Sequence, residues 1–153
     1  MRPLLLLFAV LGSLLAQPAP TRASECPQGV ARPRPVKAAI DHPFGFRLHP
    51  VMGMAVFQPS TIFQTRSGQL VRAMLGGRVV LSETKPRGGR FIWIRQTDGS
   101  ELRYGPLAHT RVGVGPCVLP GAILGRTTSS AFTLALRRNG AWIDSAPLFK
   151  DGR

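Results

Sequence analysis

Histidine, cysteine and acidic residues are scarce in this 153-residue chain. It holds three histidines, two cysteines and seven Asp and Glu residues. A catalytic zinc site usually takes three protein ligands, so three scattered histidines leave little material for one. The carboxylates are few and scattered, and no serine lies in a nucleophile-elbow pattern. The composition therefore speaks against most hydrolase classes.

The chain also lacks an apolar run long enough to span a membrane. The run at residues 4–16 is shorter than the ~20 residues that a spanning helix needs. Arg2 before it and the small residues at 21 and 23 after it predict a secretory signal peptide over residues 1–24. A membrane anchor is the alternative. We expect a periplasmic or secreted mature chain without a transmembrane segment.

Basic residues strongly outnumber acidic ones. The chain has 20 Lys and Arg residues against 7 acidic ones, and without Arg2 and Arg22 its net charge is +11. Such a balance favours polyanionic surroundings, while solubility alone is an equally good explanation. No nucleic-acid-reading motif is present, so we expect no nucleic-acid partner.

Helical periodicity is missing as well, and what remains predicts an all-β chain. Short runs of β-branched and aromatic residues alternate with glycine turns from residue 40 onward. Asp98-Gly99 and Asn139-Gly140 each separate two such runs, which predicts two hairpins with positive φ angles at these turns. We expect an extended Pro/Arg-rich arm at residues 25–39, one domain at 40–149 and a tail at 150–153.

The predicted domain contains a weak internal sequence repeat. Residues 68–71 are followed by a second glycine-led strand at 77–80, and the same arrangement recurs at 115–118 and 121–124.

The two cysteines predict one disulfide. In an oxidising compartment an even pair favours a bond between Cys26 and Cys117. This bond would tie the arm to a late loop. The alternative is a nucleophile pair of Cys117 with His109.

Residues 43–50 read Pro-Phe-Gly-Phe-Arg-Leu-His-Pro, followed by Gly53, and further blocks follow in order at 68–80, 90–94, 102–107, 112–125 and 132–140. Together they resemble the lysostaphin/LytM-type zinc metallopeptidases, peptidase family M23, which cut the peptide cross-links of bacterial cell walls. The resemblance implies a LytM-like duplicated hybrid motif, a β-roll or sandwich in a single domain.

The same resemblance places the family's zinc and catalytic positions. The metal positions fall on Gln58, Ile62 and Thr133, and the catalytic ones on Pro106 and Ala131. Glutamine is a poor zinc ligand, and Ile, Pro and Ala are not ligands. We therefore expect a degenerate member without a zinc cofactor.

These observations give one function hypothesis and two alternatives. The hypothesis is an exported, catalytically inactive domain that binds peptidoglycan or an acidic envelope protein such as a wall amidase through its former groove. The candidate binding residues are Arg47, His49, Gln58, Arg103, Tyr104 and Thr133. The alternatives are an active peptidase with a displaced metal site, and a structural envelope protein.

Overall fold

The computed structural model describes residues 25–27, 29, 34–86, 88–128 and 131–149. The predicted signal peptide and tail lie outside these ranges. Within them the chain is almost entirely β, as predicted. The elements are β1 Ala39–His42, β2 Gly45–Leu48, β3 Ala55–Gln58, β4 Thr61–Gln64, β5 Leu70–Arg72, β6 Gly77–Lys85, β7 Gly89–Arg95, β8 Glu101–Thr110, β9 Cys117–Val118, β10 Ile123–Thr127, β11 Ala131–Arg138, β12 Ala141–Ile143 and a 3-10 turn at Ala146–Leu148. No helix in the described part is long and apolar enough to cross a membrane.

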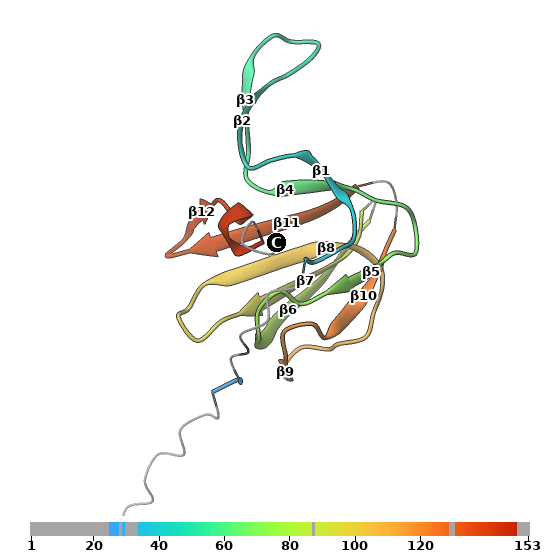
Figure 1. Ribbon diagram of the computed structural model, residues 1–153, viewed down its shortest axis with the longest axis vertical. Helices are drawn as coiled ribbons and strands as arrows, with labels where there is room; N and C mark the ends of the chain where they lie inside the picture. Colours follow the sequence, from blue (N-terminus) through green and yellow to red (C-terminus); the bar gives the residue numbers. More distant parts are fainter. Residues whose placement is uncertain (1–24, 28, 30–33, 87, 129–130, 150–153) are drawn as a thin grey trace, which may run out of the picture.

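One large antiparallel sheet forms the body of the molecule (Figure 1). Its strand order is β1-β4-β11-β8-β7-β6-β9, with β12 beside β11 and β10 between β8 and β5. Strands β2 and β3 form a separate two-stranded hairpin that extends away from the body beyond β1 and β4 (Figure 1).

The internal repeat of the sequence forms two strand pairs, and each pair joins one strand from each repeat. The first repeat supplies β5 and β6, and the second supplies β9 and β10. Strand β5 pairs with β10 and β6 pairs with β9, so each strand of one repeat lies beside a strand of the other. This pairing gives the duplicated arrangement that the sequence repeat indicated.

The core lies on one face of the large sheet because alternate side chains of a strand point to opposite faces. The ring of Phe63 on β4 lies 6.0 Å from that of Phe132 on β11 and 5.7 Å from that of Phe149. Core side chains from the sheet include Ile92, Ile94, Leu102, Tyr104, Leu134 and Leu136. The other face of β4, β11, β8 and β7 lies outside this core cluster.

Both predicted hairpins form, but their turns differ. Asn139 and Gly140 have φ angles of 49° and 79°, the two positive values of a two-residue type I′ turn. In the other turn only Gly99 has a positive φ, and the Gln96 N–H donates to the Ser100 carbonyl across three loop residues. Asp98 instead accepts bonds from the Ser100 N–H and hydroxyl at 2.9 and 2.6 Å. The expected positive φ at Asp98 is therefore wrong, because its side chain stabilises the longer loop.

The arm is tied to the domain at several places. The predicted disulfide between Cys26 and Cys117 is confirmed, with Cα atoms 5.4 Å apart. The Arg72 N–H donates to the Pro35 carbonyl at 2.8 Å, and Val36 is 1% exposed within the core. The arm therefore contributes to the core as well as lying on the domain.

Large apolar side chains cover the β2–β3 hairpin. Phe46, Leu48 and Val51 are 78%, 73% and 87% exposed. The Phe57 ring holds the hairpin base together, with the rings of Phe44 and Phe46 each 5.2 Å away.

Candidate functional site

Four of the five family positions lie on three neighbouring strands of the large sheet, β4, β11 and β8. Thr133 on β11 lies opposite Ile62 on β4 and, on its other side, opposite Gly105 on β8. Pro106 follows Gly105 through a cis peptide bond. Ala131 lies two residues before Thr133 on the same strand, and therefore on the same face.

The polar atoms at these positions bind other parts of the chain. The Thr133 hydroxyl donates to the Gly105 carbonyl at 2.7 Å. Gln58 lies at the end of β3, where its side-chain amide donates to the Ser60 hydroxyl at 2.7 Å. The side chains of Ile62, Pro106 and Ala131 carry no donor or acceptor. The cluster can therefore neither bind a cation strongly nor activate a water molecule.

The histidines do not rebuild a metal site nearby. His42 on β1 is the cross-strand neighbour of Ile62, and its Nε2 lies 3.8 Å from an Asp41 carboxylate oxygen, both side chains being exposed. His49 lies in the hairpin loop, and His109 is exposed at the far end of β8. Among the described residues, no three His, Cys, Asp or Glu side chains come together as a metal-binding group.

The candidate binding residues divide between two parts of the fold. Arg103 and Thr133 share the outer face of the sheet. Arg47 and His49 belong instead to the projecting hairpin, where the His49 Nδ1 accepts the N–H groups of Val51 and Met52 at 3.3 Å each. The His49 side chain thus stabilises the hairpin loop through hydrogen bonds. Gln58 lies at the base of the hairpin, opposite Gly45.

One predicted binding residue is wrong, and the alternative role for Cys117 is excluded. The Tyr104 side chain is fully buried, and its hydroxyl accepts the Met74 N–H at 3.0 Å, so it cannot line a binding surface. Burial raises the pKa of this hydroxyl above its ordinary value, and the Met74 hydrogen bond opposes that shift only partly. Cys117 is disulfide-bonded, which rules out the nucleophile pair with His109.

An arginine–tryptophan shelf lies on the same outer face as Thr133. We define it as Trp93 on β7, Arg103 on β8, Arg137 on β11 and Trp142 on β12. The Arg103 guanidinium lies 5.7 Å from the Trp93 ring and 5.4 Å from the Trp142 ring. The Arg137 guanidinium lies 4.7 Å from Trp93, and the two tryptophan rings are 5.9 Å apart. Such contacts hold the rings and cations in fixed positions.

Two nitrogens of the shelf are buried and lack a hydrogen-bond partner within the described residues, the Nε of Arg103 and the indole nitrogen of Trp93. Burial lowers the pKa of Arg103, and the nearby Glu83 carboxylate opposes that shift. Arginine is not deprotonated in proteins at neutral pH, so the guanidinium carries its positive charge. A hollow of about 330 Å³ beside Trp93, lined also by Leu81, Glu101 and Arg137, makes this part of the face accessible to a ligand.

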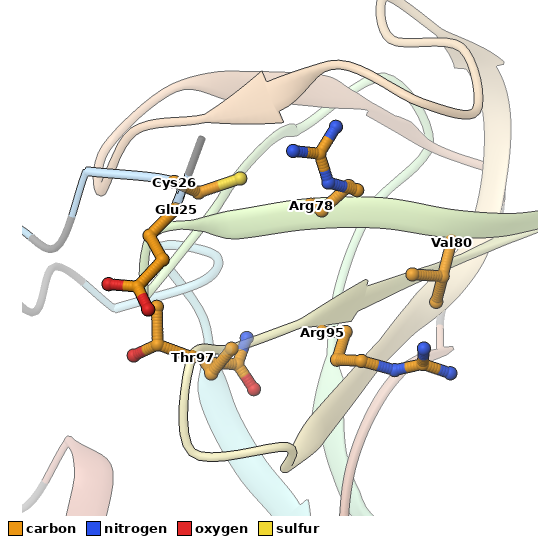
Figure 2. A pocket seen from close by; sticks show the side chains of 7 residues that line it. Glu25, Cys26, Arg78, Val80, Arg95 and Thr97 are labelled. Atoms are coloured by element: carbon orange, nitrogen blue, oxygen red, sulfur yellow. The ribbon is translucent and has the colours of Figure 1, made fainter. Parts of the chain in front are cut away.

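A second hollow lies at the seam between the arm and the sheet and shares Val80 and Arg95 with the hollow beside Trp93 (Figure 2). It has a volume of about 240 Å³ and is lined by Glu25 and Cys26 of the arm, Arg78 of β6, and Arg95 and Thr97 at the end of β7. Because this hollow lies beside the Cys26–Cys117 disulfide, we interpret it as a structural junction between the arm and the sheet.

The comparisons with known proteins agree with this geometry. The family model described as Peptidase family M23 matches residues 57–143, more than half of the chain. The chain belongs to peptidase family M23. No curated protein matches the chain.

Several solved structures share the fold of this M23 domain. Helicobacter pylori Csd3 is 24% identical, with a TM-score of 0.63 over 73% of this chain and 33% of that one. A zinc-containing peptidase from Vibrio cholerae is 22% identical, with a TM-score of 0.58 over 71% of this chain and 39% of that one. A chain of the SpoIIIAH–SpoIIQ complex is 16% identical, with a TM-score of 0.62 over 74% of this chain and 96% of that one. The M23 domain thus spans well under half the length of the first two proteins.

Zinc, which peptidases of this family normally use, does not fit the residues of this M23 domain. The face where the family positions meet offers the methyl groups of Ile62 and Ala131 and the engaged hydroxyl of Thr133. Zinc requires thiolate, imidazole or carboxylate ligands.

The sequence interpretation missed Trp93 and Trp142 as site residues. A usable signal was present at the Asn139-Gly140 turn. A two-residue hairpin places residues 137 and 142 opposite each other, which is their observed register. Cross-strand pairs of aromatic and cationic residues interact in this arrangement.

Glu101 anchors the shelf from the sheet side. Its carboxylate accepts hydrogen bonds from Arg95 at 2.7 and 2.9 Å and from Arg137, and its side chain is 9% exposed. Burial pushes the pKa of Glu101 upward, but the hydrogen bonds and charges of Arg137 and Arg95 outweigh it. The pKa therefore lies below its ordinary value.

We expect Glu101 to make the free energy of unfolding of the domain fall as the pH becomes acidic. A carboxylate with a lowered folded pKa stabilises the fold above its unfolded pKa of about 4.3. It loses that contribution as the pH falls through the folded pKa. Denaturant unfolding between about pH 7 and pH 2 should show this loss, and Glu101→Gln should both lower stability at pH 7 and flatten the acidic slope. Equal slopes in the two proteins would contradict the assignment.

Proposed function

We propose that this chain is an exported, catalytically inactive M23 domain that binds a partner in the bacterial envelope. The observation that carries this proposal is the set of residues at the five family positions. Gln58, Ile62, Pro106, Ala131 and Thr133 cannot hold zinc or activate water, although the strands that carry the last four pair in one sheet. The fold is retained, although these five positions lack the zinc ligands and catalytic groups that the family normally has.

The shelf supports binding as the use of this face. Trp142 is partly exposed, and Arg103 and Arg137 bring positive charge next to it. Aromatic and arginine side chains are enriched among the residues that dominate binding energies. The partner we propose is peptidoglycan or an acidic envelope protein such as a wall amidase.

Two further observations fit an envelope location. The disulfide between Cys26 and Cys117 requires an oxidising compartment to persist, and residues 1–24 have the pattern of a signal peptide. One structural neighbour comes from a complex of SpoIIIAH and SpoIIQ, so this fold occurs within a protein–protein assembly.

Co-sedimentation of the mature chain with purified wall sacculi, and capture of partners from an envelope extract, test the proposal. We expect binding at low salt that weakens at high salt, because exposed charges are screened within about 10 Å at 0.1 M. Trp142→Ala should weaken the affinity roughly thirtyfold, which corresponds to the about 2 kcal/mol typical of a dominant interface residue. Leu119→Ala is the matched control, since Leu119 is 55% exposed and lies outside the shelf.

The outcomes separate the competing functions. Binding to sacculi alone identifies a wall module, and capture of one protein identifies a regulatory partner. No binding at low salt, or equal losses for Trp142→Ala and Leu119→Ala, would overturn the binding proposal in favour of a structural role. Cleavage of wall peptides would instead support an active enzyme.

A further inference from the structure

A basic pocket lies outside the M23 site, where the arm crosses β5 and β10. It is lined by Arg34, Pro35, Val36, Lys37, Gly68, Gln69, Leu70, Arg72 and Arg126, and its volume is about 500 Å³. None of these residues belongs to the shelf or to the five family positions. The pocket is therefore a feature separate from the proposed binding face.

Four cationic side chains line the basic pocket and no acidic one does. Arg34 and Lys37 come from the arm, Arg72 from β5 and Arg126 from β10. The sequence has no Asp or Glu from residue 42 to 82 or from 102 to 143. Within the described residues, the arginines that pair with carboxylates are elsewhere, at positions 95, 137 and 138. Within the part of the chain that the structure describes, no carboxylate thus neutralises the positive charge of the pocket.

Two of the guanidinium groups are held in place by the backbone. An Nη1 donor of Arg72 binds the Gly121 carbonyl at 2.9 Å, and an Nη1 donor of Arg126 binds the Gly68 carbonyl at 2.7 Å. A guanidinium has five N–H donors, so each group keeps donors for a ligand. Fixing the groups in advance lowers the entropy that binding would otherwise cost.

Hydrogen bonds also fix the walls that carry these cations. The Arg72 N–H donates to the Pro35 carbonyl at 2.8 Å, and the Gln69 side chain donates to the Lys37 carbonyl at 3.3 Å. The turn before β5 is bound to β10, because the Gly68 N–H donates to the Thr127 carbonyl at 2.9 Å. Arm, turn and β10 therefore hold the cations as one unit.

We propose that the basic pocket binds a phosphate-bearing anion. Like charges that share a site repel one another, and a bound anion would remove that repulsion. A phosphate carries more charge than a single carboxylate, and the planar fork of arginine matches its oxygens in a bidentate arrangement. The phosphate can come from a lipid headgroup or from a free or polymer-linked phosphate, two sources with the same chemistry.

The test measures binding of inorganic pyrophosphate to the mature chain by calorimetry, in sodium chloride of constant ionic strength. We expect Arg72→Gln, Arg126→Gln and Lys37→Gln each to weaken binding about tenfold, the loss typical of one charge-assisted hydrogen bond. Arg138→Gln is the charge-matched control, because Arg138 lies on β11 outside the basic pocket, and it should change binding less than about twofold. No side-chain hydrogen bond to protein is seen for Lys37 in the described part, so Lys37→Gln tests the pocket even if the arginine variants fail to fold.

Flotation with vesicles distinguishes the two phosphate sources. Vesicles of phosphatidylcholine with phosphatidylglycerol are compared with vesicles of phosphatidylcholine alone. Binding to the mixed vesicles that Lys37→Gln weakens about tenfold identifies a lipid headgroup. Pyrophosphate binding without vesicle binding identifies a free or polymer-linked phosphate. Absence of pyrophosphate binding, or equal weakening by Arg138→Gln, overturns the proposal. Neither result bears on the shelf, whose test uses sacculi and Trp142.

Discussion

Replacing Phe63 with alanine is expected to lower the free energy of unfolding by about 3–5 kcal/mol, the range for truncating a buried phenylalanine. Phe63 is fully buried, and its ring lies between those of Phe132 on β11 and Phe149 after the last 3-10 turn. The variant loses the transfer free energy of the ring and leaves a cavity that the paired strands β4 and β11 cannot easily close. Denaturant unfolding followed by tryptophan fluorescence measures the change.

Phe46→Ala is the matched control for this prediction. Phe46 lies on the projecting hairpin and is 78% exposed, so its removal should change stability by less than about 0.5 kcal/mol. A loss from Phe46→Ala as large as that from Phe63→Ala would mean that the hairpin is part of the core. The account of where the core lies would then be wrong.

Removing the disulfide is the second change with a large expected effect. Cys26 and Cys117 are separated by 91 positions, and closing a loop of that length stabilises the fold by about 4–5 kcal/mol in the chain-entropy model. Measured values are often smaller, so the double variant Cys26→Ser/Cys117→Ser should lose about 2–5 kcal/mol. Thermal or denaturant unfolding of the two proteins gives the difference.

Reduction supplies the internal control for the disulfide. A reductant should destabilise the wild-type chain by the same amount as the double substitution and leave the double variant unchanged. Equal stability of the wild type and the double variant would contradict a stabilising role for this bond.

Local patterns in the sequence predicted much of the fold. The runs around Asp98-Gly99 and Asn139-Gly140 form the hairpins β7–β8 and β11–β12, because turn residues fix the position of the strands on either side. The cysteine pair formed as predicted for an even pair of cysteines. These features depend on short segments or on residue type, which the sequence shows directly.

The error at Tyr104 came from setting strand periodicity aside. Leu102 and Tyr104 lie on one face of β8 and Arg103 on the other, so a tyrosine next to a surface arginine points into the core. The resemblance of residues 102–107 to the family suggested Tyr104 as a binding residue. The alternation of side chains along β8 instead directs Tyr104 into the core.

The shelf and the basic pocket could not be predicted in the same way. The contact of Arg103 with Trp142 depends on the predicted β11–β12 hairpin but also on the pairing of β11 with β8, which only the complete sheet order shows. The basic pocket joins residues 34–37, 68–72 and 126, and no local period connects these segments. Such sites arise from topology, so the structure is needed to find them.

The central claim is that this M23 domain lacks the zinc site of its family, and its zinc content is the most direct test. The purified mature chain would be incubated with excess zinc, dialysed and measured by elemental analysis, together with an assay for cleavage of wall peptides. We predict substoichiometric zinc and no cleavage. One tightly held zinc per chain, lost when His42, His49 or His109 is replaced and accompanied by cleavage of wall peptides, would contradict the account.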